Sequence, residues 1–319
     1  MRVPAPIIDM HLHAMPADYQ GSPPVGFSLR GSPPVHDPLN PWAETFDAWH
    51  KDPEINQLFS PMTDDELRDE TLAVMEKRNM IGVVSGVSLE LTDRWRAAAP
   101  DRVIPGVVLY LHAPAISPSD LGELHAEGRI AVLGEVANQY NGIDPSDPQL
   151  EPYLAVAEEL DIPVQIHVGP GPPGAPYLGF PNYRGRLHSP LLLEEILVRH
   201  PRVRLYVAHA GWPMLDDMLA LLYTHPRVYV DVGILTFGIP TAEFHRYLRV
   251  IVEAGFGDRV MFGSDQMVWP GAIEPAIGSI EAADFLSDEQ KRAILYDNAA
   301  RFLRLTPEDI TRHRLGFSN

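Results

Sequence analysis

Eight short runs of apolar, often β-branched residues recur along the chain, and stretches with helical patterns separate them. The runs cover residues 7–13, 81–88, 103–110, 131–137, 162–169, 204–211, 228–233 and 260–266. Their near-continuous hydrophobicity suits parallel strands that are buried on both faces. Because a doubly wound sheet would usually stop at fewer strands, this alternation predicts a single (β/α)8 TIM barrel of the α/β class. We place the barrel at residues 1–305 and expect residues 306–319 to form a peripheral tail.

The helical stretches carry recognisable start signals. Thr63 and Glu66 have the spacing of a capping box, in which each side chain accepts a hydrogen bond from the other residue's backbone N–H. This box predicts a helix that runs through Met80. Residues 287–290 repeat the spacing and predict a helix through Leu303.

Residues 15–61 interrupt the alternation directly after the first predicted strand. The stretch is rich in proline, glycine and aromatic residues and exceeds ordinary loop length. Loops that long inside compact domains are usually functional lids or disordered segments. The aromatic residues favour a folded lid, and we predict one over residues 15–61. They are Phe27, Trp42, Phe46, Trp49 and Phe59.

The composition of the chain excludes several classes of protein. With 45% hydrophobic residues the chain can bury a large core, which excludes intrinsic disorder. A formal charge of −18 without a basic stripe argues against nucleic-acid binding. No apolar run approaches the roughly 18 residues that a membrane span requires. The chain has no cysteines, so any metal must be held by histidine and carboxylate side chains.

The start of the chain lacks the pattern of a signal peptide, because residues 1–6 lead straight into the first predicted strand. A cytoplasmic location is the default expectation, and a trimmed export signal stays open. We expect a small-molecule substrate and no nucleic-acid or membrane partner. Whether the chain forms a homo-oligomer also stays open.

Histidine and acidic side chains stand at the carboxyl ends of five predicted strands. They are His11, His13, Glu135, His167, His209 and Asp265. Since side chains alternate between the faces of a strand, the first two share one face, here the barrel interior. Buried imidazoles need partners for their ring nitrogens, and catalytic residues of such barrels come from the ends of several strands. These six residues are therefore our candidate metal ligands.

The order of these motifs resembles a known family. Asp-Met-His-Leu-His at 9–13, the isolated His167 and His209, and Phe-Gly-Ser-Asp at 262–265 are similar to motifs of the amidohydrolase superfamily. More closely, the chain resembles the amidohydrolase-related branch (amidohydrolase 2), which includes aminocarboxymuconate-semialdehyde decarboxylase and related hydrolases and lactonases. The resemblance spans nearly the whole chain, including residues 296–301, which are similar to the closing helix of that branch.

The resemblance implies a role for most of the candidate ligands. It implies that His11, His13 and Asp265 bind a first divalent metal. His167 and His209 would bind a second metal, or would assist the substrate and the first metal if only one is present. Imidazole and carboxylate ligands suit zinc first and manganese next.

The fourth strand departs from the pattern of relatives with two metals. Those relatives carry a bridging carboxylated lysine there, whereas this chain has Glu135. Because a carboxylate can also bridge two cations, a centre with one metal and a centre with two both stay open. Asp9 shares the face of His11 one layer deeper. We interpret it as a group that orients a ligand imidazole, with purely structural hydrogen bonding as the alternative.

Hydrolysis is the first hypothesis for the reaction. A bound cation lowers the pKa of its water from about 15.7 towards 7. Asp265 is expected to accept the proton of that water and pass it to the leaving group. His209 or the metal would polarise the substrate carbonyl. The chain would then be a metal-dependent hydrolase that cleaves an amide, lactone or ester bond in a small organic substrate.

Two other functions stay open. The resemblance makes a lyase realistic, in which an aromatic or unsaturated acid loses carbon dioxide and Asp265 manages the proton. A carboxylate at the fourth strand resembles the hydrolytic, two-metal relatives more closely than the decarboxylases. A barrel that binds a ligand without turnover would predict a broken ligand set, but all six positions carry competent side chains.

Candidates for substrate binding lie in the loops that follow the strands. They are His112, Gln139, Tyr140, Arg184, Arg186, His188, Trp212 and Trp269. An arginine in such a loop can clamp a substrate carboxylate through two hydrogen bonds, and the two tryptophans can wall an apolar pocket. Solvated arginines and ordinary packing of the tryptophans are the alternative interpretations.

Overall fold

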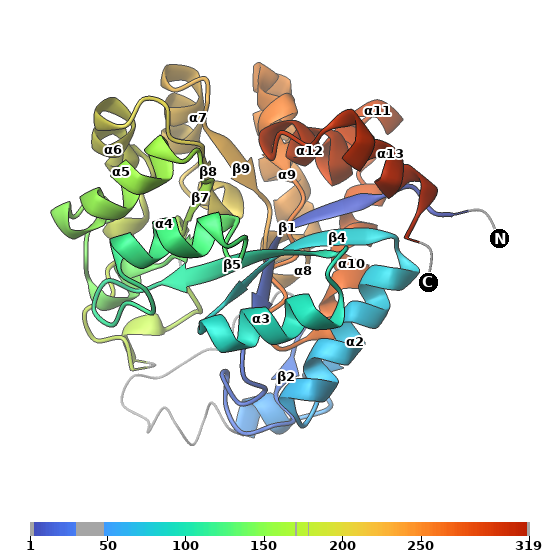
Figure 1. The fold of residues 1–319 in the computed structure, drawn as a ribbon. Helices are drawn as coiled ribbons and strands as arrows, with labels where there is room; N and C mark the ends of the chain where they lie inside the picture. Colours follow the sequence, from blue (N-terminus) through green and yellow to red (C-terminus); the bar gives the residue numbers. More distant parts are fainter. Residues whose placement is uncertain (1–2, 30–47, 170, 178, 318–319) are drawn as a thin grey trace.

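The computed structural model describes residues 3–29, 48–169, 171–177 and 179–317 (Figure 1). Eight parallel strands follow one another in one sheet in chain order. They are β1 (Ile7–Ala14), β4 (Met80–Gly86), β5 (Val103–Leu109), β6 (Val132–Val136), β7 (Val164–Ile166), β8 (Leu205–Val207), β9 (Tyr229–Asp231) and β10 (Val260–Met261). The N–H of Met10 donates to the carbonyl of Phe262 at 2.9 Å, which joins the last strand to the first. The predicted (β/α)8 barrel is confirmed.

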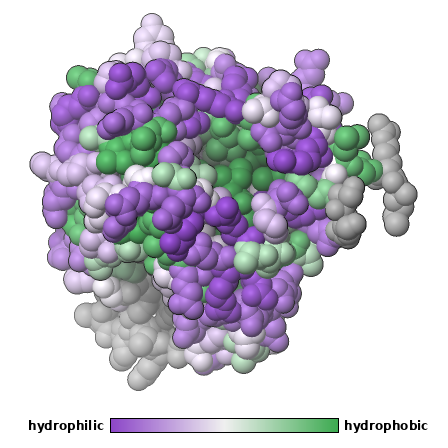
Figure 2. Space-filling model, viewed as in Figure 1, coloured by the Kyte–Doolittle hydropathy of each residue, from purple (hydrophilic) through white to green (hydrophobic). Residues whose placement is uncertain are grey.

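Helices surround the strands (Figure 1). The longer ones are α2 (Asp64–Lys77), α3 (Leu89–Ala98), α4 (Pro118–Ala126), α5 (Glu151–Glu159), α7 (Leu215–Thr224), α9 (Thr241–Ile251) and α10 (Ile273–Glu281). The shorter ones are α6 (Glu194–Arg199), α8 (Leu235–Gly238), α11 (Asp288–Arg292) and α12 (Asn298–Phe302). Figure 2 shows mostly hydrophilic side chains over them on one face, with hydrophobic areas in the hollows between. Among the described residues, no helix has the length and apolar character to cross a membrane.

Both predicted capping boxes form, at Thr63 before α2 and at residues 287–290 before α11. The prediction that the first helix runs through Met80 was wrong. Helix α2 ends at Lys77, and Met80 already begins β4. Between them Asn79 has a φ of +50°, a left-handed conformation that ends the helix and turns the chain into the strand.

Three strands that carry predicted site residues end earlier than the sequence suggested, and β7 stops at Ile166, directly before His167. Strand β8 gives way to the turn η6 (Ala208–Gly211), in which His209 has a φ of +57°. Strand β10 is also short, and Asp265 has a φ of +56°. Left-handed backbone cannot continue an extended strand. Both residues therefore lie in turns directly beyond their strands, and the N–H of Asp265 donates to the carbonyl of His11 at 2.7 Å.

The apolar side chains of strand β1 point to different faces of the sheet in the first and second halves of the strand. Its pairing with β4 shifts in register between Asp9 and Leu12. Before the shift, Ile8 and Met10 join a buried cluster with Tyr206 and side chains of α12, whereas Leu12 belongs to the larger cluster that faces the surrounding helices. Such a shift changes the direction in which the following side chains point. Strand β1 therefore supplies apolar side chains to the barrel interior and also carries His11 and His13 near its end.

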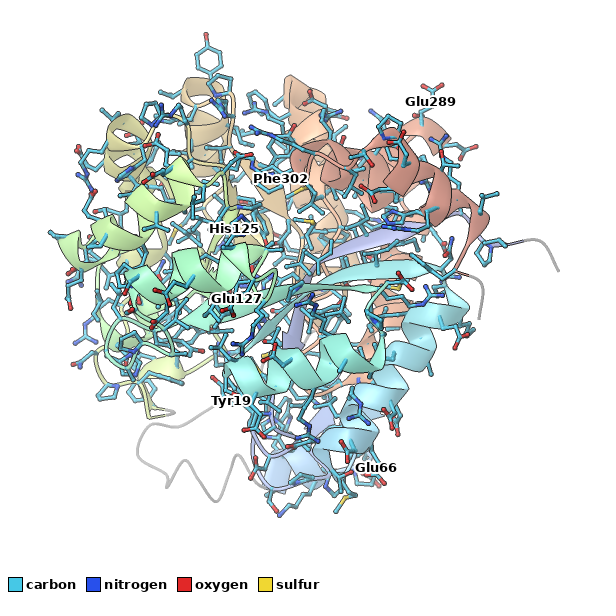
Figure 3. All side chains as sticks on the ribbon, in the orientation of Figure 1. Tyr19, Glu66, His125, Glu127, Glu289 and Phe302 are labelled. Atoms are coloured by element: carbon cyan, nitrogen blue, oxygen red, sulfur yellow. The ribbon has the colours of Figure 1, made fainter. Side chains whose placement is uncertain are left out.

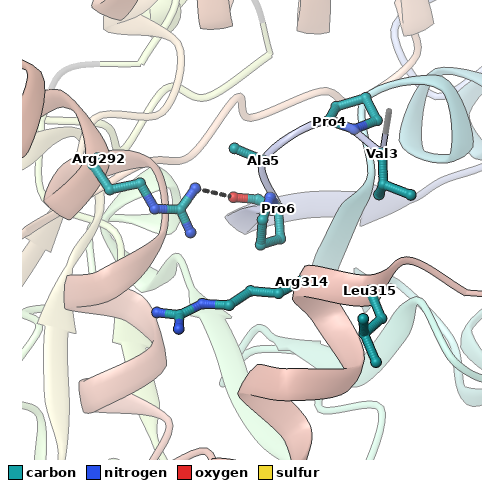
Figure 4. A pocket seen from close by; sticks show the side chains of 7 residues that line it. All are labelled: Val3, Pro4, Ala5, Pro6, Arg292, Arg314 and Leu315. Carbon is teal, nitrogen blue, oxygen red and sulfur yellow. Dashed lines mark hydrogen bonds between the residues drawn. The ribbon is translucent and has the colours of Figure 1, made fainter. Parts of the chain in front are cut away.

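The end of the barrel where the strands begin is covered by the C-terminal segment. The predicted peripheral tail forms helix α13 (Pro307–Leu315). On α13 the side chain of His313 is buried, and its Nδ1 lies 3.0 Å from the hydroxyl of Tyr296. Beside it, Arg292 donates to the carbonyl of Pro6 at 2.8 Å in the wall of a surface pocket (Figure 4). This pocket lies at the opposite end from the site residues.

The described parts of residues 15–61 pack against the other end of the barrel. Strand β2 (Gly26–Phe27) pairs antiparallel with β3 (Leu58–Phe59). The indole N–H of Trp269, in the loop after β10, donates to the carbonyl of Val25 at 2.8 Å. The segment is thereby attached to the loop that follows the last strand.

Tyr19 attaches the same segment to a second place on the barrel. Its hydroxyl lies 3.0 Å from the hydroxyl of Tyr110, which follows β5. In Figure 3 Tyr19 lies in the lower half of the molecule and Phe302 in the upper half. The middle of the predicted lid, residues 30–47 with Trp42 and Phe46, lies outside the described residues. A lid function for residues 15–61 therefore stays a prediction.

Candidate metal centre

The six candidate ligands lie together at the end of the barrel where the strands finish. All are buried, and the most exposed of them, Glu135, has an exposed fraction of 8%. The Nε2 atoms of His11 and His13 lie 3.1 Å apart. Nδ1 of His167 lies 3.0 Å from Nε2 of His209. Side chains that are far apart in the sequence thus form two adjacent histidine pairs.

Glu135, in β6, lies between the two pairs. Its Oε1 is 2.6 Å from Nδ1 of His167 and 3.3 Å from Nε2 of His209. The same oxygen is 3.8 Å from Nε2 of His11, and Oε2 is 3.9 Å from Nε2 of His13. One carboxylate is therefore within ion-pair distance of all four imidazoles.

Asp265 faces the histidines from the loop after β10. Its Oδ1 lies 3.1 Å from Nε2 of His13 and 3.5 Å from Nε2 of His11. Its Oδ2 lies 3.8 Å from Nδ1 of His209. Asp265 therefore reaches both histidine pairs, as Glu135 does.

The atoms of the cluster form three overlapping sets that could each hold a metal ion. In each set one ligand atom from every residue lies within 4.8 Å of the others. The sets are His11, His13 and Glu135; His11, His209 and Asp265; and Glu135, His167 and His209. Every candidate ligand belongs to at least one set, and His11, Glu135 and His209 each belong to two.

Asp231, at the end of β9, contacts the side chain of His11. It was not among the site residues predicted from the sequence. Its Oδ1 lies 3.1 Å from Nδ1 of His11 and accepts a hydrogen bond from the N–H of Gly233 at 2.8 Å. The side chain of Gln165 donates to its Oδ2 at 2.9 Å. This contact leaves Nε2 of His11 directed at the cluster. An acidic residue inside the apolar run 228–233 was the available signal.

Asp9 does not orient an imidazole, so that interpretation was wrong. Its Oδ1 accepts hydrogen bonds from the backbone N–H groups of His11 at 2.9 Å and Ser264 at 3.0 Å. Since burial raises the pKa of Asp9 to about 7, the carboxyl group stands near the border between its two protonation states at neutral pH. Asp9 holds the backbone of β1 against the loop after β10, and Asp231 is the residue that contacts the ring.

The charges in the cluster shift the pKa values of His11 and Glu135. Burial alone would lower the pKa of His11, but the nearby carboxylates, first Asp231 and then Asp265, raise it to about 10. Burial acts to raise the pKa of Glu135, yet the imidazole of His167 and the other histidines hold it well below its usual value. The cluster thus pairs ionised carboxylates with imidazole protons, which a divalent cation can displace.

Three of the predicted substrate-binding residues lie beside His167. The ring of Tyr140 is 5.0 Å from the ring of His167, and the ring of His188 is 5.3 Å from it. The side chain of Gln139 is fully buried and donates to the backbone carbonyl of His167. Burial lowers the pKa of His188 to about 3, so its ring is uncharged.

The side-chain hydrogen bonds of the other five predicted substrate-binding residues do not involve the candidate ligands where the structure describes them. His112, Arg184 and Arg186 are exposed. The guanidinium of Arg184 donates to carbonyls of its own loop, including that of Pro181 at 2.9 Å. The indole N–H groups of the two tryptophans are also engaged: Trp212 donates to Glu243 at 3.1 Å, and Trp269 donates to the predicted lid segment. A role for these residues in substrate binding stays a prediction.

A comparison of the sequence with models of known protein families finds a match to one family. The family model described as Amidohydrolase matches residues 8–305. A search of curated proteins finds no match to the chain. The match spans the whole barrel and all six candidate ligands.

Solved structures share the architecture at low sequence identity. An uncharacterised TIM-barrel protein from Bordetella bronchiseptica has a TM-score of 0.61 at 18% identity, with 96% of this chain and 100% of that chain covered. A probable 2-pyrone-4,6-dicarboxylic acid hydrolase from Acinetobacter baumannii has a TM-score of 0.59 at 16% identity, with 94% and 99% covered. The 5-carboxyvanillate decarboxylase from Sphingomonas paucimobilis has a TM-score of 0.59 at 15% identity, with 95% and 100% covered. These likenesses show a common fold.

Proposed function

The chain belongs to the amidohydrolase family, and from this premise we propose that it is a metal-dependent hydrolase that cleaves an amide, lactone or ester bond in a small organic substrate. The observation that carries the proposal is the position of Glu135, within ion-pair distance of all four imidazoles. A carboxylate between two histidine pairs can bridge two cations. Such a centre is suited to hydrolysis, in which water attacks a carbonyl.

The donor atoms of the cluster fit a divalent cation. Imidazole nitrogens and carboxylate oxygens are ligands of zinc first and of manganese next. We assign His11, His13 and Asp265 to one ion. His167 and His209 would hold a second ion, with Glu135 between the two. When bound, the metal supplies a nucleophile at neutral pH because it lowers the pKa of water from about 15.7 towards 7.

In this proposal, side chains of the protein transfer the proton and polarise the substrate carbonyl. The carboxylate of Asp265, beside both histidine pairs, accepts the proton of the attacking water and returns it to the leaving group. Nδ1 of His209 lies 3.0 Å from the carbonyl of Gly233. This hydrogen bond fixes the tautomer in which Nδ1 carries the proton, so Nε2 has a free lone pair for a metal. When the ring is protonated at both nitrogens, Nε2 can instead donate to the oxygen of the substrate carbonyl.

Non-oxidative decarboxylation is the alternative reaction. The structural likeness to a 5-carboxyvanillate decarboxylase is as high, by TM-score, as the likeness to the pyrone hydrolase. In this alternative Asp265 would deliver a proton to the carbon that loses carbon dioxide. Hydrolysis consumes water and yields an acid, so the products separate the two reactions.

Metal analysis and product detection test the proposal together. Purified protein is expected to contain one to two equivalents of a divalent transition metal. A screen of lactones, amides, esters and aromatic carboxylates, with parallel detection of acid and of carbon dioxide, is expected to give metal-dependent acid release. Carbon dioxide release without acid formation would favour the lyase. Full turnover by metal-free protein would contradict both reactions.

A further inference from the structure

His188 is a buried histidine whose ring nitrogens lack hydrogen-bond partners among the described residues. Its exposed fraction is 0%, and neither Nδ1 nor Nε2 has a partner with hydrogen-bond geometry in the described part of the chain. The carbonyl of Gly169 lies near the ring, but it is already the partner of Nε2 of His167, at 2.9 Å. It ends the short turn η4 (Gly185–His188) in the connection that follows β7. An unpaired polar atom in the interior is costly and rare in native proteins. A ring with two such atoms needs a partner that the described residues do not supply.

The rings around His188 place it next to the metal centre. Its ring lies 4.7 Å from the ring of Tyr183 and meets the ring of His167 nearly at a right angle, at 5.3 Å. Tyr140 contacts His167 as well, and its ring is 6.4 Å from that of His188. His188 belongs to none of the three potential ligand sets. It is therefore a neighbour of the centre and not one of its ligands.

The surroundings also fix what His188 can offer. Because neither nitrogen has a carboxylate partner among the described residues, a charged ring would be strongly disfavoured there. A neutral imidazole presents one N–H donor and one acceptor nitrogen. Its natural ligand is an uncharged polar group, such as a hydroxyl or a carbonyl.

We propose that His188 is a substrate-recognition residue, whose ring nitrogens hydrogen-bond an uncharged polar group of the substrate beside His167. The inference rests on the proposed function, because it places the substrate at the same centre. A packing role alone would not need the nitrogens, because an apolar side chain could fill the space. This difference between ring volume and ring nitrogens can be tested.

The test is the variant His188→Phe, assayed on the substrate that the screen identifies. We expect KM to rise at least tenfold, kcat to change less, and metal content to stay the same. We also expect the thermal midpoint to fall less than in His313→Phe, which adds the same ring volume, because at His188 two unpaired polar atoms leave the interior. A KM and kcat within twofold of the parent would overturn the proposal. If the variant does not fold, His188→Gln, which retains a donor and an acceptor, is expected to keep a lower KM than His188→Leu.

His313→Phe is the matched control, because it makes the same change at a buried histidine whose nitrogen has a partner. Nδ1 of His313 bonds Tyr296 at the opposite end of the barrel. This variant is expected to lose stability and to keep the parent's KM. The stability comparison needs no substrate, and an equal loss of stability in both variants would contradict the inference. If Asp265→Asn is inactive while His188→Phe keeps the parent's KM, only the role of His188 fails. Retained turnover in Asp265→Asn would instead contradict the proposed function.

Discussion

The two ends of the barrel are held together by different interactions. Where the strands begin, the ring of Phe302 packs 5.3 Å from Tyr206 and 4.9 Å from Tyr229, and the buried His313 has Tyr296 as its partner. Where the strands finish, carboxylates and imidazoles share a buried cluster, and His188 has no partner among the described residues. At the first end the buried histidine is hydrogen-bonded within the chain, whereas at the second end the buried histidine His188 has no such partner among the described residues.

This difference indicates which end of the barrel lowers the stability of the folded state. Apolar contacts at the first end stabilise the folded state without any added component. At the other end, like charges and unpaired polar atoms lie in the interior, an arrangement that destabilises the fold unless a cation or a substrate compensates for it. Substitutions at the two ends should therefore have separate effects, on stability at one and on chemistry at the other.

The largest effect is expected from Asp265→Asn at the second end. The amide keeps the shape of the side chain but cannot accept the proton of the attacking water, so kcat should fall by about 10²–10⁴-fold. Steady-state kinetics measure the loss, and a thermal midpoint close to that of the parent shows that the fold is intact. Activity within tenfold of the parent would exclude Asp265 as the proton carrier.

At the first end, Phe302→Ala should reduce stability without touching the chemistry. Removing a buried phenyl ring leaves a cavity and is expected to lower the free energy of unfolding by about 3–5 kcal/mol. Denaturant titration measures this loss, and Phe302→Leu, which keeps most of the volume, should lose less. The kcat of the folded variant should equal that of the parent. A changed metal content would show that the two ends are coupled.

Asp231 and Asp9 allow a comparison within the second end. Asp231→Asn alters the group that contacts Nδ1 of His11, and changes to such supporting residues typically cost about 10–100-fold in metal affinity. Asp9→Asn keeps an oxygen that accepts the two backbone N–H groups, so its metal affinity should stay close to that of the parent. Competition with a chelator measures both affinities. Equal losses would show that the two carboxylates do not differ in role.

The sequence was sufficient for the features that depend on local pattern. The eight apolar runs predicted the barrel, because each buried strand carries its own signal. His11 and Asp265 could be proposed as site residues because the ends of successive parallel strands meet at one end of a barrel. The structure places both in one cluster, although their role as ligands stays a prediction.

The sequence was not sufficient where a role depends on three-dimensional proximity. Asp9 and Asp231 both stand in apolar strands, and only the structure shows which of them contacts the ring of His11. The turn at His209 also escaped prediction, since an apolar run does not reveal a left-handed residue. The same holds for His188, because a histidine in a loop gives no sign of whether its nitrogens have partners.

The smallest expected effect isolates a single hydrogen bond at the first end. Tyr296→Phe removes the hydroxyl that bonds Nδ1 of His313 at 3.0 Å and leaves the ring in place. A neutral hydrogen bond contributes about 0.5–1.5 kcal/mol, so the free energy of unfolding should fall by that amount, with kcat, KM and metal content unchanged. Denaturant titration resolves a change of this size. A loss of metal or of activity would contradict the independence of the two ends, because no candidate ligand contacts this pair.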